Sequence, residues 1–219
     1  LNTVTMTHIY NNNAVGVRVI GDDNVIGEAS LGNWINGNGC GVQIDEEADS
    51  TRLTNNFIGL AADGETPAGN GSANILVQGT NTTIGSLNAG NVIADSEVGI
   101  LIDGYATVAD IAYNRIGTNA DGDAAVPNGV GIKVERGNGN RINNNLIAYN
   151  GDGVIVKQGQ GNRIIDNEIY SSTRLAIDLY PAGVTINDTG DTDSGANNLQ
   201  NYPVVTAAGV SGDRYIIQA

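Results

Sequence analysis

Apolar residues alternate with polar or small residues in short runs that return along the chain. The clearest runs open with a small residue or Asn, as in Gly41-Val-Gln-Ile and Gly99-Ile-Leu-Ile. Alternation with a period of two is typical of a strand that buries one face. Seven such strands are predicted, 22 to 33 residues apart, opening at Gly16, Gly41, Asn74, Gly99, Gly131, Gly153 and Ala176.

Two further short strands recur in each repeat. Three strands per repeat, each with inward apolar residues, predict an all-β fold: a three-sided parallel β-helix of about seven coils, in which every strand pairs with its copy in the next coil. One series is centred on Ile26, Leu53, Ile84, Ile111, Ile142 and Ile164. The other has the form Asn-x-Ile, beginning at Asn33, Asn56, Asn91, Asn114, Asn145 and Asn167.

A longer repeat spans two coils. A shift of 58 residues places Ile26-Gly27 on Ile84-Gly85 and Ile58-Gly59 on Ile116-Gly117. A fixed period of this kind is the signature of a solenoid, whose units bury their apolar face only by stacking. Two coils carry longer loops, 60–72 and 118–130, which both contain Ala-Asp-Gly.

Gly and Asn fall where the chain turns between strands. Both residue types tolerate left-handed backbone conformations, so they suit tight corners. An Asn that recurs at one corner can also hydrogen-bond its copy in the next coil, which satisfies amide groups next to an apolar interior. We therefore interpret the recurring Asn residues as structural.

Composition and charge narrow the possible partners. The net charge of −14 repels phosphate backbones and anionic membrane surfaces, so we expect neither nucleic acid binding nor direct membrane insertion. A single Cys and a single His exclude an internal disulfide and a zinc cluster, and Cys40 is expected to be a buried small residue. The chain begins at Leu1 without a signal peptide, and we expect a processed fragment.

The regular pattern stops near residue 181. We expect the β-helix to span residues 1–181, an acidic, Gly-rich linker or calcium loop to span 182–201, and C-terminal strands to occupy 202–219. Tyr202-Pro-Val-Val and Arg214-Tyr-Ile-Ile are predicted to be strands of a following module.

The repeats resemble the bacterial right-handed parallel β-helix proteins of the pectin-lyase-like superfamily, which are secreted or surface-anchored and mostly of unassigned function. The resemblance rests on the Gly-Val-x-Ile and Asn-x-Ile-Gly patterns, the loops at Asp63 and Asp121, and the segment from Ala176-Ile-Asp-Leu to Asn201-Tyr-Pro-Val, and it covers nearly the whole chain. It implies a secreted, extracellular or cell-surface protein. The superfamily includes lyases, hydrolases, epimerases and adhesins, so the fold alone fixes no chemistry.

In enzymes of this superfamily, the resemblance implies, the active groove runs along the outside of one long sheet. Two outward rows are predicted there: Arg18, Gln43, Leu76, Leu101, Lys133, Ile155 and Asp178, and then Ile20, Asp45, Gln78, Asp103, Glu135, Lys157 and Tyr180.

The second row suggests a catalytic cluster. Asp103 and Glu135 would be neighbours in coils about 4.8 Å apart, which would push one carboxylate towards neutrality and let it act as an acid beside Lys157. Arg18 and Lys133 would then contact substrate. The alternative is an ordinary exposed ladder of ion pairs.

Trp34 and Phe57 are predicted to lie side by side on the outside of adjacent coils. They could form a flat surface on which a sugar ring stacks, or a patch that another chain segment covers. The second interpretation is favoured because an uncapped solenoid invites packing.

The acidic stretch after residue 187 offers oxygen ligands at Asp188, Asp191, Asp193 and Asn197, as calcium loops do. It departs from the EF-hand pattern, and a hydrated linker explains it equally well. The pairs Asp63 with Glu65 and Asp121 with Asp123 are interpreted as turns.

Two hypotheses remain. The favoured one is a non-catalytic secreted or cell-surface module, structural or adhesive, that contacts polysaccharide or another surface protein and is steadied by calcium. The alternative is a polysaccharide lyase, glycoside hydrolase or uronan epimerase with Asp103, Glu135 and Lys157 in its groove.

Overall fold

The structure is a computed structural model that describes residues 1–104, 108–211 and 214–218. Three parallel sheets of seven strands each form the body of the molecule. The first sheet contains β1 (Thr3–Val4), β4 (Val25–Ile26), β7 (Arg52–Leu53), β10 (Thr83–Ile84), β13 (Asp110–Ala112), β16 (Arg141–Asn143) and β19 (Arg163–Ile165). The second contains β2 (His8–Tyr10), β5 (Trp34–Asn36), β8 (Phe57–Ile58), β11 (Val92–Ile93), β14 (Arg115–Ile116), β17 (Leu146–Ala148) and β20 (Glu168–Tyr170). The third contains β3 (Val15–Val19), β6 (Cys40–Ile44), β9 (Ala73–Val77), β12 (Val98–Asp103), β15 (Val130–Arg136), β18 (Asp152–Val156) and β21 (Ile177–Leu179).

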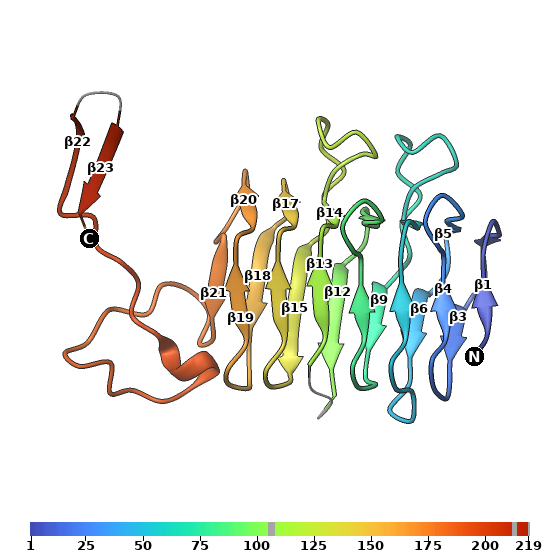
Figure 1. The fold of residues 1–219 in the computed structure, drawn as a ribbon, viewed down its shortest axis with the longest axis horizontal. Helices are drawn as coiled ribbons and strands as arrows, with labels where there is room; N and C mark the ends of the chain where they lie inside the picture. Colours follow the sequence, from blue (N-terminus) through green and yellow to red (C-terminus); the bar gives the residue numbers. More distant parts are fainter. Residues whose placement is uncertain (105–107, 212–213, 219) are drawn as a thin grey trace.

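Each coil of the chain contributes one strand to every sheet. Figure 1 shows the coils following one another from the N-terminal to the C-terminal end of the body. Strands of successive coils pair in parallel and in register, as Ile35 with Ile58 and Ile93 with Ile116. The predicted right-handed parallel β-helix, with three strands per coil and seven coils, is confirmed.

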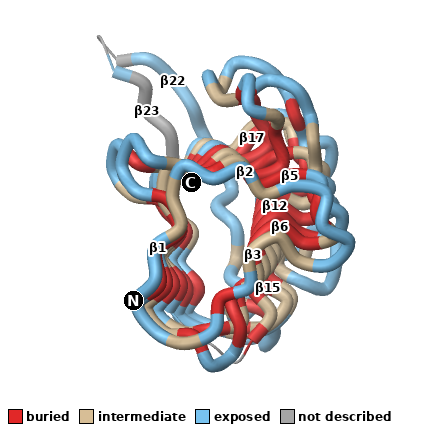
Figure 2. The backbone as a smooth tube through the Cα atoms, turned by 90° about the vertical axis from the view of Figure 1, so that its right-hand side faces the viewer, coloured by how far each residue is buried: buried red, intermediate tan, exposed pale blue. Residues whose placement is uncertain are grey.

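Inward apolar side chains form continuous columns inside the coils. Figure 2, which looks along the stack, shows buried residues lining the inside of the tube. In the second sheet the middle of the column is fully buried, and in such a position each Ile contributes about 1.5–3 kcal/mol to the free energy of folding. Its members are Ile35, Ile58, Ile93, Ile116 and Ile147.

An asparagine ladder runs along the corner between the first and second sheets. The backbone N–H and the side-chain amide of Asn91 both donate to Oδ1 of Asn114, at 3.0 and 2.9 Å, and Asn114 repeats this pattern with Asn145 at 3.0 Å for both bonds. The other members, Asn33, Asn56 and Asn167, continue the same series. The predicted structural role of these residues is confirmed.

The two long loops fold over the second sheet and contact each other. The N–H of Ala120 donates to the carbonyl of Gly64 at 2.9 Å. Asp63 accepts hydrogen bonds from the Thr66 hydroxyl and from the N–H groups of Thr66 and Glu65. These bonds, the Thr66 hydroxyl first, lower the pKa of the Asp63 carboxyl to about 2. Asp63 therefore closes a turn, as predicted.

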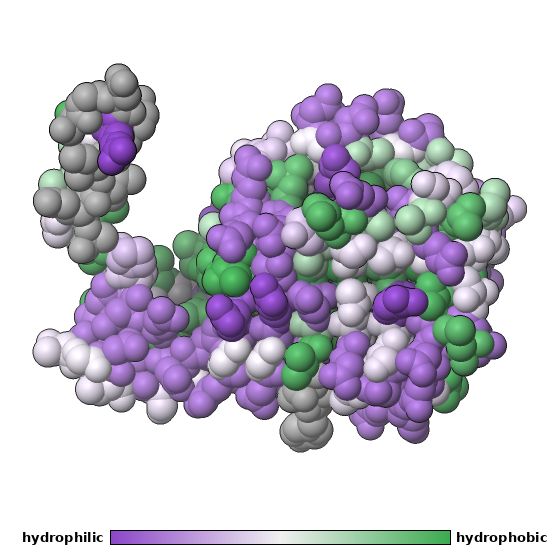
Figure 3. Space-filling view, in the orientation of Figure 1, coloured by the Kyte–Doolittle hydropathy of each residue, from purple (hydrophilic) through white to green (hydrophobic). Residues whose placement is uncertain are grey.

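The segment after β21 turns back onto the end of the coils. A short 3₁₀ helix, η1 (Ala196–Leu199), places Ala196, 2% exposed, against the apolar core. Part of the segment predicted as a linker therefore caps the last coil. Its surface is mainly hydrophilic (Figure 3).

An antiparallel hairpin of β22 (Ala207–Ser211) and β23 (Arg214–Gln218) follows. The prediction of a strand at Arg214 is confirmed, but the predicted strand at Tyr202 is wrong, because residues 202–205 form no strand. Pro203 has no N–H to donate, which is consistent with this.

Candidate functional site

The outer face of the third sheet carries the residues predicted to act on a substrate. Its first outward row lies as expected, with Arg18 paired to Gln43, Leu101 to Lys133 and Ile155 to Asp178. Leu76 lies between Gln43 and Leu101 in the same row. The row is therefore partly apolar, as the sequence indicated.

The second row differs from the prediction. The register between β12 and β15 shifts after Ile102, so that Asp103 pairs with Arg136 and Glu135 is the extra residue of a bulge. Arg136 holds Asp103 with two contacts to Oδ1, from Nε at 2.8 Å and from a terminal nitrogen at 2.7 Å. The predicted carboxylate pair of Asp103 and Glu135 is wrong, because Arg136 occupies the paired position.

Glu135 lies between two lysines. Lys133 Nζ contacts one carboxylate oxygen and Lys157 Nζ the other, both at 2.6 Å. These cations, Lys133 first and Lys157 second, hold the pKa of Glu135 below its usual value, and Glu135 in turn raises the pKa of Lys157. The expected neutral acid is therefore a carboxylate.

Tyr180 extends this cluster. Its ring centroid lies 5.6 Å from Lys157 Nζ, which is the distance of a cation–π contact. The cluster of Lys133, Glu135, Lys157 and Tyr180 is thus a set of mutually satisfied groups along three coils.

Arg18 is also engaged within the protein. Its guanidinium contacts Asp45 Oδ2 at 2.7 Å through Nε and at 2.5 Å through a terminal nitrogen, and Gln43 donates to the other oxygen at 2.9 Å. The Asp45 side chain is 6% exposed, so this contact satisfies a buried charge.

Two further carboxylates lie beside this face. Asp152, with 7% of its side chain exposed, contacts Arg174 at 2.6 Å. Asp178 is also buried, and both its oxygens accept from the N–H of Gly183 at 3.2 Å. Neither carboxylate is open to a polymer lying on the sheet.

Trp34 and Phe57 are neighbours, as predicted. Their ring centroids are 5.8 Å apart and their planes differ by 6°, which is an offset stack of one ring over the other. Rings that stack in this way do not present one flat surface, so the predicted platform for a sugar ring is wrong.

The chain's own loop covers part of this pair. A Cβ at Gly64 would lie 3.6 Å from the Phe57 ring, and Phe57 packs against a small apolar cluster under the loops that includes Leu60 and Val126. This agrees with the interpretation of a patch covered by another chain segment.

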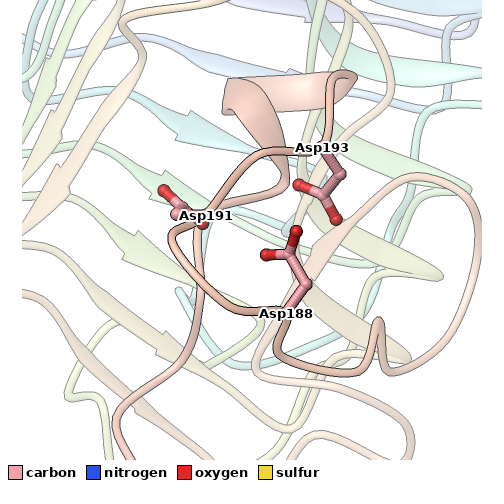
Figure 4. Close-up of side chains that lie close together, drawn as sticks. All are labelled: Asp188, Asp191 and Asp193. Atoms are coloured by element: carbon pink, nitrogen blue, oxygen red, sulfur yellow. The ribbon is translucent and has the colours of Figure 1, made fainter.

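The acidic segment brings three carboxylates together. One oxygen from each of Asp188, Asp191 and Asp193 lies within 4.8 Å of the others. Figure 4 shows the side chains of Asp188 and Asp193 pointing towards each other across the loop. Thr192 donates to Oδ2 of Asp188 from its N–H and its hydroxyl, at 3.1 and 2.8 Å.

Two oxygens of this cluster have no hydrogen-bond donor among the described residues. Oδ1 of Asp188 and Oδ1 of Asp193 are screened from solvent, and within the described chain neither accepts a hydrogen bond. Burial first, and then the charges of Asp188 and Asp191, raise the pKa of Asp193. Carboxylate oxygens in this state are the ligands that a hard cation such as calcium prefers.

Asn197 is not part of this cluster. Its Oδ1 accepts from the N–H of Asn162 at 3.0 Å, and its amide donates to the Asn162 carbonyl at 2.7 Å. The prediction that Asn197 is a metal ligand is wrong, because this side chain extends a corner ladder through Asn140 and Asn162.

Sequence reasoning missed Arg136, Asp152 and Arg174, which complete the ion pairs of the third sheet. An Asp and an Arg 22 residues apart, at one corner of successive coils, could have indicated the second pair.

Cys40 is buried as predicted, and burial raises the pKa of its thiol to about 11. In the described ranges no helix is long and apolar enough to cross a membrane.

Comparison with known proteins agrees with the architecture. The chain resembles the mannuronan C-5 epimerase AlgE4 A-module of Azotobacter vinelandii, with a TM-score of 0.54 and 18% identity over 84% of this chain. It spans 57% of that module, and at this identity the likeness shows the fold alone. A search of curated protein sequences found no match. The family model described as periplasmic copper-binding protein (NosD) matches residues 66–197, which is more than half of the chain, and the chain therefore belongs to the NosD family.

Proposed function

We propose that the chain is an exported, non-catalytic β-helix module that serves as a rigid scaffold. The observation that carries this proposal is the pairing of charges on the third sheet. Asp45, Asp103, Glu135 and Asp152 each contact a Lys or Arg at 2.7 Å or less. Export is inferred from the family's description as periplasmic.

Acid–base catalysis needs a group that changes protonation near the working pH. Glu135 departs from this requirement, since two lysines lower its pKa. Asp103 is occupied by Arg136. A lyase, hydrolase or epimerase reaction at these residues would first have to break their ion pairs, which argues for the scaffold and against the enzymatic alternative.

The description of the family names copper, so the metal-ligand side chains of this chain are compared with those that copper prefers. Copper prefers imidazole, thiolate and thioether ligands, and this chain has one His, one Cys and one Met. His8 Nε2 lies 3.1 Å from the Asn36 amide nitrogen, whereas Cys40 is buried in the third sheet. Among the described residues, Asp188, Asp191 and Asp193 are the one place where three His, Cys, Asp or Glu side chains lie close enough together to hold a metal ion. The residues present do not fit a copper centre.

The aspartate cluster supports a second proposal, that calcium binds at Asp188, Asp191 and Asp193. This proposal rests on the two carboxylate oxygens that accept no hydrogen bond from the described part of the chain. The loop leads directly into Ala196 and Asn197, which cap the last coil. A bound cation would hold this cap in place, so its effect would be on stability.

The scaffold proposal is tested by a turnover assay. The purified chain is incubated with alginate, pectate and neutral glycans, and unsaturated products, new reducing ends and changes in uronate stereochemistry are measured. We expect no turnover. Turnover that disappears in Glu135→Gln and persists in Glu168→Gln, an exposed glutamate of the second sheet, would establish the enzymatic alternative instead.

A further inference from the structure

A groove follows the corner between the first and second sheets, away from the third sheet. Its volume is about 450 Å³, which lies within the range of ligand pockets, about 300–1,000 Å³. Polar groups dominate its lining, which includes Asn55, Asn88, Tyr113, Arg115, Asn144 and Leu146.

Tyr113 stands in this groove in a left-handed backbone conformation, with φ of 61°. The residues at the same corner of other coils include Met6, with φ of 50°, and Asn55, Asn144 and Asp166, of which the last three are of the types that adopt this conformation readily. A bulky aromatic residue pays a conformational cost at such a position, and outliers of this kind are found at functional sites. Tyr113 is 39% exposed, so part of its surface stays accessible to a ligand.

Tyr149 provides an internal comparison. It is the other aromatic residue of the described chain with a positive φ, 63°, but its ring packs edge-on against Tyr170 with centroids 5.6 Å apart. Packing within the protein therefore accounts for Tyr149. No ring contact or hydrogen bond of the Tyr113 side chain is found within the described residues.

The polar groups around Tyr113 are available to a ligand. The side-chain amides of Asn55 and Asn88 make no hydrogen bond to the described protein, and Arg115 has no ion pair there. Together these groups offer amide donors and acceptors, the five N–H groups of a guanidinium, and the face of an aromatic ring. Sugars present the matching surfaces, with hydroxyl groups around the ring edge and C–H groups on its faces.

We propose that this groove binds an uncharged polysaccharide chain, with a sugar ring on Tyr113 and its hydroxyl groups on Asn55, Asn88 and Arg115. The net charge of −14 decides against a polyuronate, because long-range repulsion opposes a polyanion while one Arg provides a single local cation. The site goes beyond the scaffold role and does not depend on it, since binding and turnover are measured separately.

The test is titration of the full chain with neutral hexasaccharides of glucose, mannose, galactose or xylose units, and with hexagalacturonate as the charged counterpart. We expect at least one neutral hexasaccharide to bind with a Kd of about 1 mM or below, and at least tenfold more tightly than hexagalacturonate. Tyr113→Asn and Arg115→Gln should each weaken this binding at least tenfold, whereas Tyr113→Phe should retain it.

Two controls keep the result interpretable. Tyr113→Asn relieves the strained conformation, so its Tm should rise by about 2–4 °C, and a loss of binding then cannot be ascribed to unfolding. Arg163→Gln, an exposed arginine outside the groove, should bind as the unaltered chain does. The proposal is overturned if no neutral hexasaccharide binds, if hexagalacturonate binds more tightly, or if Tyr113→Asn leaves binding unchanged.

Discussion

Asn197 hydrogen-bonds Asn162 in the way that an Asn of a following coil would. Its Oδ1 accepts from the Asn162 N–H at 3.0 Å, while its own N–H donates to the Gly159 carbonyl at 2.8 Å. Asn162 makes the same contact with Asn140 one coil earlier. The C-terminal segment thus satisfies backbone groups that a bare solenoid end would leave open.

The first prediction concerns this cap. Asn197→Gly removes the side-chain hydrogen bonds but tolerates the left-handed backbone at this position, φ 48°. We expect the free energy of unfolding to fall by about 1–3 kcal/mol, because the N–H of Asn162 loses its acceptor. Urea unfolding measures this. Asn198→Gly, at an exposed neighbour with φ of 59°, should leave stability unchanged or raise it; equal losses in both variants would argue against a cap.

The second prediction concerns buried hydroxyl groups. Thr82 is 1% exposed, and its hydroxyl has no partner within the described structure. Thr82→Val replaces this group with a methyl of similar size, so we expect the free energy of unfolding to rise by about 1 kcal/mol. Thermal or urea unfolding checks this.

Thr118 is the matched control. It is fully buried as well, but its hydroxyl donates to the carbonyl of Asn119 at 3.0 Å. Thr118→Val should therefore lower the free energy of unfolding by about 1 kcal/mol. If both valine variants lose stability to the same extent, the Thr82 hydroxyl has a partner, such as an ordered water.

The third prediction concerns calcium. The pKa of Asp193 is raised, so in the absence of a cation its contribution to stability is present at low pH and is lost as the pH rises through that pKa. Calcium that binds only the folded chain should reverse this loss at neutral pH, and the Tm should rise with calcium concentration. The rise should vanish at a pH low enough to protonate the cluster.

Asp193→Asn separates the two effects. It removes one charge from the cluster, so the Tm without calcium should rise and the response to calcium should weaken. Asp121→Asn, at an exposed loop residue, should change neither. A Tm that is the same with calcium and with a chelator would remove calcium from the account.

The fold followed from the sequence because its signals are local. Period-two alternation fixes which side chains face inward, and Asn residues such as Asn91 and Asn114 fix the corners. The first outward row followed from the same register. The ladder through Asn197 did not, because this residue lies beyond the point near residue 181 at which the repeat pattern stops.

The candidate site depended on details that periodicity does not determine. One extra residue in β15 moved Glu135 out of the register that places it beside Asp103. The adjacency of Trp34 and Phe57 was predictable, but the rotation of their rings depends on side-chain torsions and on the covering loop. The role of Tyr113 lies in its backbone conformation, which no residue pattern indicated.

The fourth prediction concerns pH and salt. Because the pKa of Glu135 is lowered, its ion pairs stabilise the fold above the unfolded-state pKa, and this contribution is lost as the pH falls through the folded-state pKa. All three charged side chains remain 26–33% exposed, so the contribution is small, below about 1 kcal/mol. Glu135→Gln should lower the Tm slightly at neutral pH and low salt, and the difference should disappear in about 1 M salt.

The pKa of the Glu135 carboxyl, measured by NMR titration of its side-chain carbon, tests the central claim most directly. The account predicts a value below that of an ordinary glutamate, with the carboxylate held by Lys133 and Lys157 and unable to act as an acid at neutral pH. A pKa of about 6 or above, as in a catalytic acid, would contradict it.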